Sequence, residues 1–164
     1  MKALKAEDLR AFTQALFLGT VFDRFLLREA EFRTFCTFTV NGAAEVRWYS
    51  EEELESERVE EYTSWEKLKP LCFGLIRGKR TPLSFRLDMK LAPGDAEKLC
   101  ASVHPGKRDD SGGFYLNLRF EDGALTVISA AAQNIFPPDR ATEHAWDEWV
   151  QEFFRHHGLV FRER

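Results

Sequence analysis

The chain has 164 residues, of which 44% are hydrophobic, 13% aromatic and 30% charged, and its net charge is −4. A chain of this length and composition can bury a full hydrophobic core, which excludes a disordered protein and favours one globular domain over residues 1–164. The acidic balance excludes a general electrostatic attraction to nucleic acid or to an anionic membrane, but it leaves room for a local basic patch.

The three cysteines, Cys36, Cys72 and Cys100, are widely spaced, and each has apolar neighbours. This pattern is typical of small buried residues in a reducing compartment, and not of a disulfide framework. The N-terminal segment MKALKAEDLR lacks the apolar core of a signal peptide, and no apolar run is long enough to span a bilayer. We therefore expect a cytoplasmic protein without membrane contact.

The first third of the chain predicts a strand, a helix and a hairpin. The expected elements are a strand at 1–4, a helix at 6–19, a strand at 25–40, a tight turn at Asn41-Gly42 and a returning strand at 43–49. Leu9, Phe12 and Leu16 recur at helical spacing. Apolar and polar residues then alternate up to Val40, although Phe35 interrupts the polar side. Asn-Gly is the strongest short hairpin signal in any sequence.

An acidic connector follows at 50–62, where seven glutamates crowd together. Charge runs usually face water, so a solvated helix or mobile linker is the first interpretation. The alternative is an acidic segment that binds a basic partner or a divalent cation. The run has no glycine or Asx turn that would hold metal ligands at fixed angles, which disfavours the cation.

A basic loop separates the next helix from the next strand. Ser64 is a candidate cap for the following helix. Because Pro70 is unfavourable inside a helix, we expect a short turn at 64–69 and a helix that begins at Pro70 and buries Leu71, Cys72, Leu75 and Ile76. The loop LIRGKRTPLSF then follows a helix C-terminus, where cations are favourable, whereas phosphate cradles form at helix N-termini. The loop also lacks the spacing of a P-loop. The favoured interpretation is a loop that only connects the helix to the following strand, and the alternative is a basic loop that binds a ligand.

The second half predicts the same kinds of element again. These are a strand at 83–91, a helix at 93–103, a strand at 114–121, a turn at Asp122-Gly123, a strand at 124–133, a helix at 142–157 and an edge strand at 159–163. Both halves thus read as strand, helix, hairpin and helix, with a first unit at 1–77 and a second at 82–164.

The predicted fold class is α+β: an antiparallel sheet with helices layered on one face, built from these two pseudo-repeated units. The other face of the sheet would meet water or a partner. It would carry charges of both signs, from Arg33, Arg86, Lys90, Arg119, Glu31, Asp88 and Glu121.

Two resemblances bear on function. The segments MKALKAEDLRAFTQAL and LAPGDAEKLCASV…FYLNLRFEDGALTVIS resemble the strand–helix–hairpin units of DNA polymerase sliding clamps, which implies a non-catalytic ring around DNA. The chain departs from clamps in its acidic connector, its Trp-rich last helix and its length, which supplies too few domains for a ring unless many copies assemble. The segment YTSWEKLKPLCFGLIRGKRTPLSFRL resembles a family of uncharacterised proteins of clostridial bacteria, a domain of unknown function, and implies no activity.

Three constellations that carry chemistry in other proteins are disfavoured. His156 and His157 diverge by about 100° on a helix, so both cannot face one metal ion. A triad of Ser111, His104 and Asp110 lacks the geometry of a nucleophile elbow. Trp146 and Trp149 could stack on nucleic-acid bases, but their helix is acidic and their spacing is that of a core stripe. Paired carboxylates for acid–base catalysis stay open.

The leading hypothesis is a non-enzymatic binding or scaffold protein of clamp-like architecture. Its candidate contacts with nucleic acid or another anion are Arg77, Lys79, Arg80, Lys107 and Arg108. The second hypothesis is a protein-interaction adaptor that uses the polar sheet face, the acidic connector or an edge strand. The third is an enzyme on an unfamiliar α+β scaffold. We expect no catalytic or metal-binding residues and no cofactor, and the partner could include a second copy of the chain.

Overall fold

A computed structural model describes residues 1–57, 59–106, 111–134 and 138–164. Within these residues the chain forms one antiparallel sheet of eight strands in the order β3-β2-β5-β6-β7-β1-β8, with β4 paired to β2. The strands are β1 (Lys2–Ala6), β2 (Leu26–Arg33), β3 (Thr37–Asn41), β4 (Thr63–Ser64), β5 (Ser84–Lys90), β6 (Ser111–Glu121), β7 (Ala124–Gln133) and β8 (Phe161–Glu163). The helices are α1 (Leu9–Phe17), α2 (Glu51–Ser56), α3 (Trp65–Ile76), α4 (Pro93–Val103) and α5 (Arg140–His156), with a short 3₁₀ helix η1 (Val46–Trp48).

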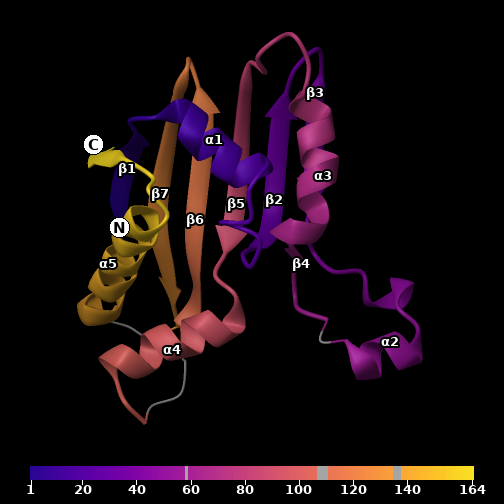
Figure 1. Ribbon diagram of the computed structural model, residues 1–164. Helices are drawn as coiled ribbons and strands as arrows, with labels where there is room; N and C mark the ends of the chain where they lie inside the picture. The colour runs from indigo at the N-terminus through magenta and orange to yellow at the C-terminus, as the bar shows by residue number, and fades with distance from the viewer. Residues whose placement is uncertain (58, 107–110, 135–137) are drawn as a thin grey trace.

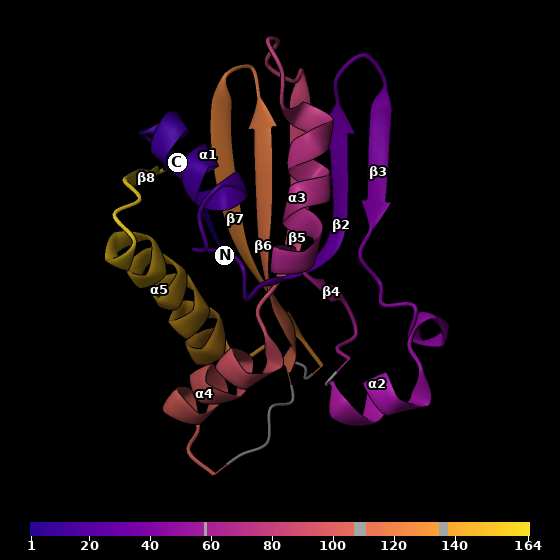
Figure 2. The same ribbon diagram turned by 45° about the vertical axis from the view of Figure 1, so that its right-hand side comes forward.

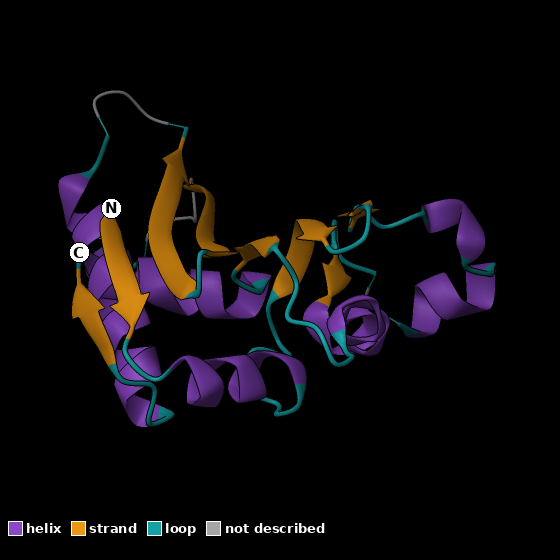
Figure 3. Cartoon of the chain, turned by 90° about the horizontal axis from the view of Figure 1, so that it is seen from above, coloured by secondary structure: helices purple, strands orange, loops and turns teal. Residues whose placement is uncertain are grey.

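The helices α1, α3 and α5 lie on one face of the sheet, and α4 lies near one end of it (Figure 1). Figure 3 shows the same layering from above, with the strands along one side and most helices along the other. The predicted fold class, an α+β fold with helices on one face of an antiparallel sheet, is confirmed. None of the helices in the described part of the chain is both long and apolar enough to cross a membrane.

The core lies between the sheet and the helices because the strands alternate as predicted. On β5, Phe85, Leu87 and Met89 are buried. On the opposite face, charges pair across strands: Arg86 lies 3.7 Å from Glu29 and 3.9 Å from Glu31. On the open face Arg86 is therefore paired with carboxylates.

One predicted hairpin is confirmed in detail. Strand β6 ends opposite Ala124, and the turn between β6 and β7 consists of Asp122 and Gly123. Both residues have positive φ, of 51° and 74°. This is the conformation that a two-residue turn of the I′ type requires, and Asp-Gly adopts it readily.

The other predicted hairpin is wrong in its position. The chain turns at 34–36, where the Thr34 N–H donates to the Cys36 carbonyl at 2.9 Å and Arg33 pairs with Thr37. Phe35 at the tip is 92% exposed, and Cys36 is exposed as well, so the expectation that each cysteine is buried fails for Cys36. Cys72 is buried as expected, and burial raises the pKa of its thiol to about 12.

Gly42 serves a different purpose from the one predicted. A Cβ atom at this position would lie 1.7 Å from the carbonyl oxygen of Leu27, so only glycine allows the two backbones to approach. Asn41 forms an Asx turn, in which its side-chain oxygen accepts from the Ala43 N–H at 2.9 Å. The chain then leaves the sheet, and the returning strand expected at 43–49 is absent: its place is taken mainly by η1.

Helix α3 begins earlier than predicted, at Trp65, and runs through Pro70. Ser64 caps it as expected, by accepting from the Lys67 N–H at 3.4 Å. The helix starts five residues before the proline, and its buried face contains Trp65 and Cys72, which are fully buried. Leu71, expected in the core, is instead 58% exposed.

The acidic connector contains α2, which projects from one end of the molecule (Figures 1 and 2). Ser50 and Glu53 form a capping box: each side chain accepts from the other residue's backbone N–H, at 3.1 and 2.8 Å. No residue of α2 is buried. The interpretation as a solvated helix is thus confirmed for α2.

The internal repeat is not confirmed. The order of the elements recurs along the chain, but the strand partners do not: β5 pairs with β2 and β6, whereas β1, its expected counterpart, pairs with β7 and β8. The division into units at 1–77 and 82–164 stays a prediction.

Candidate binding site: an apolar groove beside a basic loop

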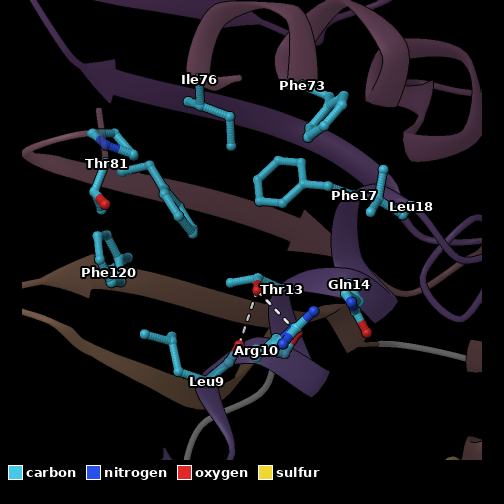
Figure 4. Close-up of a pocket in the computed structure, with 12 residues that line it drawn as sticks. Leu9, Arg10, Thr13, Gln14, Phe17, Leu18, Phe73, Ile76, Thr81 and Phe120 are labelled. Carbon is cyan, nitrogen blue, oxygen red and sulfur yellow. Dashed lines mark hydrogen bonds between the residues drawn. The ribbon is translucent and has the colours of Figure 1, made fainter. Parts of the chain in front are cut away.

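A groove of about 450 Å³ lies between α1 and α3 (Figure 4). Residues of both helices form its walls, and the start of β5 and the end of β6 close it below. It is lined by Leu9, Arg10, Thr13, Gln14, Phe17, Leu18, Phe73, Ile76, Thr81, Pro82, Phe85 and Phe120.

Aromatic rings in mutual contact form the floor of the groove and one of its walls. The ring of Phe17 lies 6.3 Å from that of Phe73 and 5.4 Å from that of Phe85, the second pair edge to face. Phe85 in turn stacks on Phe120 at 5.2 Å. Such contacts stabilise the rings in fixed positions, so the groove is preformed.

Two contacts hold the helices together at one end of the groove. The indole N–H of Trp65 donates to the Leu16 carbonyl at 2.7 Å. The ammonium group of Lys69 donates to the Gly19 carbonyl and to the Asp23 carboxylate, both at 2.6 Å. Beyond this junction the helices diverge (Figure 1). The groove is the space between them.

The groove offers few polar groups to a ligand. The hydroxyl of Thr13 is used within α1, where it donates to the carbonyls of Leu9 and Arg10 at 2.9 and 3.1 Å (Figure 4). Arg10 and Gln14 lie on the exposed surface of α1. The groove can therefore bind by burying apolar surface, with charge only at its rim.

A second hollow, of about 420 Å³, adjoins the groove and shares Ile76, Thr81 and Pro82 with it. Arg77, Lys79 and Arg80 line this hollow, so the structure brings three of the five predicted basic residues together. Lys107 and Arg108, the other two, lie outside the described residues.

The basic loop ends α3 and connects it to β5, and it also brings three cationic side chains together. Arg77 ends α3, with its N–H bonded to the Phe73 carbonyl at 2.9 Å, and Gly78 follows with a φ of 151°. None of Arg77, Lys79 and Arg80 makes an ion pair or side-chain hydrogen bond with another residue that the structure describes. An anionic partner could pair with them without breaking an existing contact.

The constellations disfavoured from the sequence have structural roles where they are described. His104 hydrogen-bonds the carboxylate of Asp139, which caps α5. This bond, followed by one from Thr142, lowers the pKa of the Asp139 carboxyl to about 2. Asp110 of the imagined triad lies outside the described residues, as does the Ser111 side chain. Trp146 is fully buried, which confirms its place in the core.

Sequence reasoning identified the cations and missed the groove. The groove could have been detected from three consecutive apolar residues, Leu16, Phe17 and Leu18. Consecutive residues of a helix point in different directions, so these three cannot all belong to one buried stripe. Leu16 is fully buried, Phe17 forms the groove floor, and Leu18 is 63% exposed at the rim.

The chain belongs to the family described as "Family of unknown function (DUF5721)", which matches residues 15–162. This confirms the predicted membership in a domain family of unknown function; the match says nothing of a clostridial source. No curated protein and no solved structure matches the chain. The resemblance to sliding clamps therefore has no support from these comparisons.

Proposed function

We propose that the protein is a non-enzymatic binding module whose α1–α3 groove takes up apolar side chains from a partner protein. The observation that carries this proposal is the preformed aromatic floor of an open groove. Its volume of about 450 Å³ falls within the range of roughly 300–1,000 Å³ typical of ligand sites. Burying apolar surface there would supply about 25 cal/mol per Å².

The surroundings of the groove favour a protein segment over a small molecule. Leu18 at one end is 63% exposed, and beyond the other end Leu83 and Phe35 are 64% and 92% exposed. Large apolar side chains exposed around a hollow are characteristic of surfaces that bind macromolecules. The cations Arg77, Lys79 and Arg80 on the same side favour a segment that also carries carboxylates.

Selection from a displayed library of short random peptides would test this function. We expect the full-length protein to enrich peptides with apolar anchors and acidic flanks. Leu18→Glu, which places a carboxylate on the groove rim, should lose them at least tenfold. Leu71→Glu is the matched control, because Leu71 is similarly exposed on α3 but lies outside the groove. Selected peptides that bind wild type and Leu18→Glu equally would overturn the proposal.

Nucleic acid is a second candidate ligand, favoured by the three cations of the basic loop. It is disfavoured by the net charge of −4 and by the pairing of Arg86 on the open sheet face with Glu29 and Glu31. Fluorescence anisotropy with labelled duplex and single-stranded DNA should then give an affinity that falls with salt, with a log–log slope near −0.9 per phosphate on a duplex. Absence of binding at low salt and micromolar protein would remove this candidate.

An enzymatic function would require polar groups that converge on one pocket. One hollow with several polar side chains, of about 380 Å³, lies against α5 and contains Thr20, Arg24, Asp95 and His157. Its charged pair is already satisfied, since Arg24 lies 3.2 Å from Asp95. We therefore place this alternative behind the binding function.

A further inference from the structure

An arm, residues 45–57, includes the first part of the acidic connector, and its composition complements that of the groove. The arm comprises η1, α2 and their flanks, and neither η1 nor α2 buries a residue. It projects from the end of the molecule opposite the basic loop (Figures 1 and 2).

The arm presents exposed apolar side chains among carboxylates. Trp48 is 82% exposed, Val46 56% and Leu54 38%. The glutamates on the arm are all exposed, namely Glu45, Glu51, Glu52, Glu53, Glu55 and Glu57. A lone exposed apolar residue needs no explanation, but this arm exposes three, and tryptophan is enriched among the residues that dominate binding energy at protein interfaces.

We infer that the arm of one copy of this chain docks into the α1–α3 groove of a second copy; this inference rests on the proposed function of the groove. Trp48 and Leu54 supply apolar anchors for the aromatic floor. The glutamates of the arm meet Arg77, Lys79 and Arg80, which have no partner among the described residues. The chain thus carries both halves of a complementary pair, an acidic apolar arm and a basic apolar groove.

The contact has to form between copies because the arm is held away from its own groove. At its base, the Thr63 N–H donates to the Gly42 carbonyl at 2.7 Å, and the Ala44 N–H donates to the Glu61 carbonyl at 2.9 Å. Lys67 also donates to the Tyr49 hydroxyl at 3.2 Å. These bonds fix the arm at the far end of the sheet, so docking joins unlike surfaces of two molecules, head to tail. Such a contact adds copies one after another until a ring closes or a filament grows.

Sedimentation velocity of the full-length chain tests this assembly. Over concentrations from about 5 to 500 µM, the range of weak protein–protein association, the wild type should show a rising average sedimentation coefficient. Trp48→Glu, which disables the arm, and Leu18→Glu, which disables the groove, should each raise the dissociation constant about tenfold or more. Leu71→Glu is expected to associate like the wild type.

Mixing the two disabled variants gives the decisive result. Trp48→Glu retains an intact groove, and Leu18→Glu retains an intact arm, so together they can form one complete contact and no second one. We expect a discrete 1:1 heterodimer that does not grow further. Association through a surface other than the arm and groove would not be restored by mixing.

Failure of this inference is distinguishable from failure of the proposed function. A wild type that stays monomeric at every concentration, or a mixture that yields no heterodimer, overturns the self-docking. If groove-specific peptides are nevertheless selected, the groove binds another protein and the proposed function stands. If neither is observed, both fail.

Discussion

The indole N–H of Trp65 should contribute more to stability than any exposed aromatic residue of this chain. Trp65 is fully buried, and it joins the first turn of α3 to the last turn of α1 through its 2.7 Å hydrogen bond to the Leu16 carbonyl. Carbonyls in the last turn of a helix have no partner within the helix, so this carbonyl depends on the indole. Trp65→Phe keeps an aromatic ring in place but removes the donor.

The expected cost is the sum of two effects. Leaving a buried carbonyl without a donor costs about 1–3 kcal/mol. The smaller ring leaves a cavity, which costs roughly 1 kcal/mol more at about 24 cal/mol per Å³. The free energy of unfolding of Trp65→Phe should therefore fall by about 2–4 kcal/mol.

Urea unfolding followed by circular dichroism measures this difference without relying on tryptophan fluorescence. Trp48→Phe is the matched control, because Trp48 is 82% exposed and its replacement should change stability by less than about 0.5 kcal/mol. If both variants unfold at the same urea concentration as the wild type, the junction of α1 and α3 is not built as described here.

Three further predictions concern the close backbone approach at Gly42, the α5 cap and the cysteines. Gly42→Ala should lower the thermal midpoint sharply or prevent folding, because the added Cβ would lie 1.7 Å from a backbone carbonyl oxygen; a midpoint near that of the wild type would refute the close approach. The pKa of the Asp139 carboxyl is lowered to about 2 in the folded protein, from about 3.9 in the unfolded chain. The ionised carboxylate therefore stabilises the fold in full above about pH 3.9, and this contribution is lost as the pH falls through about 2. The stability difference between wild type and Asp139→Asn should therefore shrink on acidification between about pH 4 and pH 2, and a constant difference would argue against the bond from His104. A thiol reagent at pH 8 should modify exposed Cys36 rapidly and buried Cys72 only on unfolding, and a wild type that shows no rapid labelling beyond that of Cys36→Ser would contradict the exposed turn at 34–36.

The two hairpins show where local sequence signals succeed and fail. Asp122-Gly123 follows a strand that pairs continuously with β7 from Gly113 to Glu121, and the local turn preference agrees with the sheet. Asn41-Gly42 carries the same local preference, but tertiary packing uses the glycine for a close backbone approach to Leu27. The turn lies at Phe35, the residue that interrupts the polar side of the strand expected to continue to Val40.

Helix α3 shows tertiary contacts overriding propensity. A proline inside a helix costs roughly 3 kcal/mol, which is why the sequence predicts a start at Pro70. The burial of Trp65 and its hydrogen bond to Leu16, together with the Ser64 cap, offset this cost and extend the helix by five residues. None of these partners is visible in a local pattern.

The candidate site was predictable only in its charged part. Arg77, Lys79 and Arg80 are adjacent in sequence, so their clustering requires no knowledge of the fold. The groove depends on how far α1 and α3 diverge from their junction. That angle is set by contacts between residues far apart in the sequence, such as the hydrogen bond from Trp65 to Leu16, which are 49 positions apart. Sequence periodicity indicates which face of each helix is apolar, but not the space left between two helices.

Amide chemical-shift mapping by NMR tests the central claim most directly. The full-length protein would be titrated with the tightest peptide from the selection, with Leu71→Glu as a parallel sample. If the groove is the binding site, the shifts should concentrate at 9–18 and 73–85 in both samples. Shifts confined to the open sheet face, around Arg86 and Arg119, or to the acidic arm would contradict the assignment of the groove as the binding site.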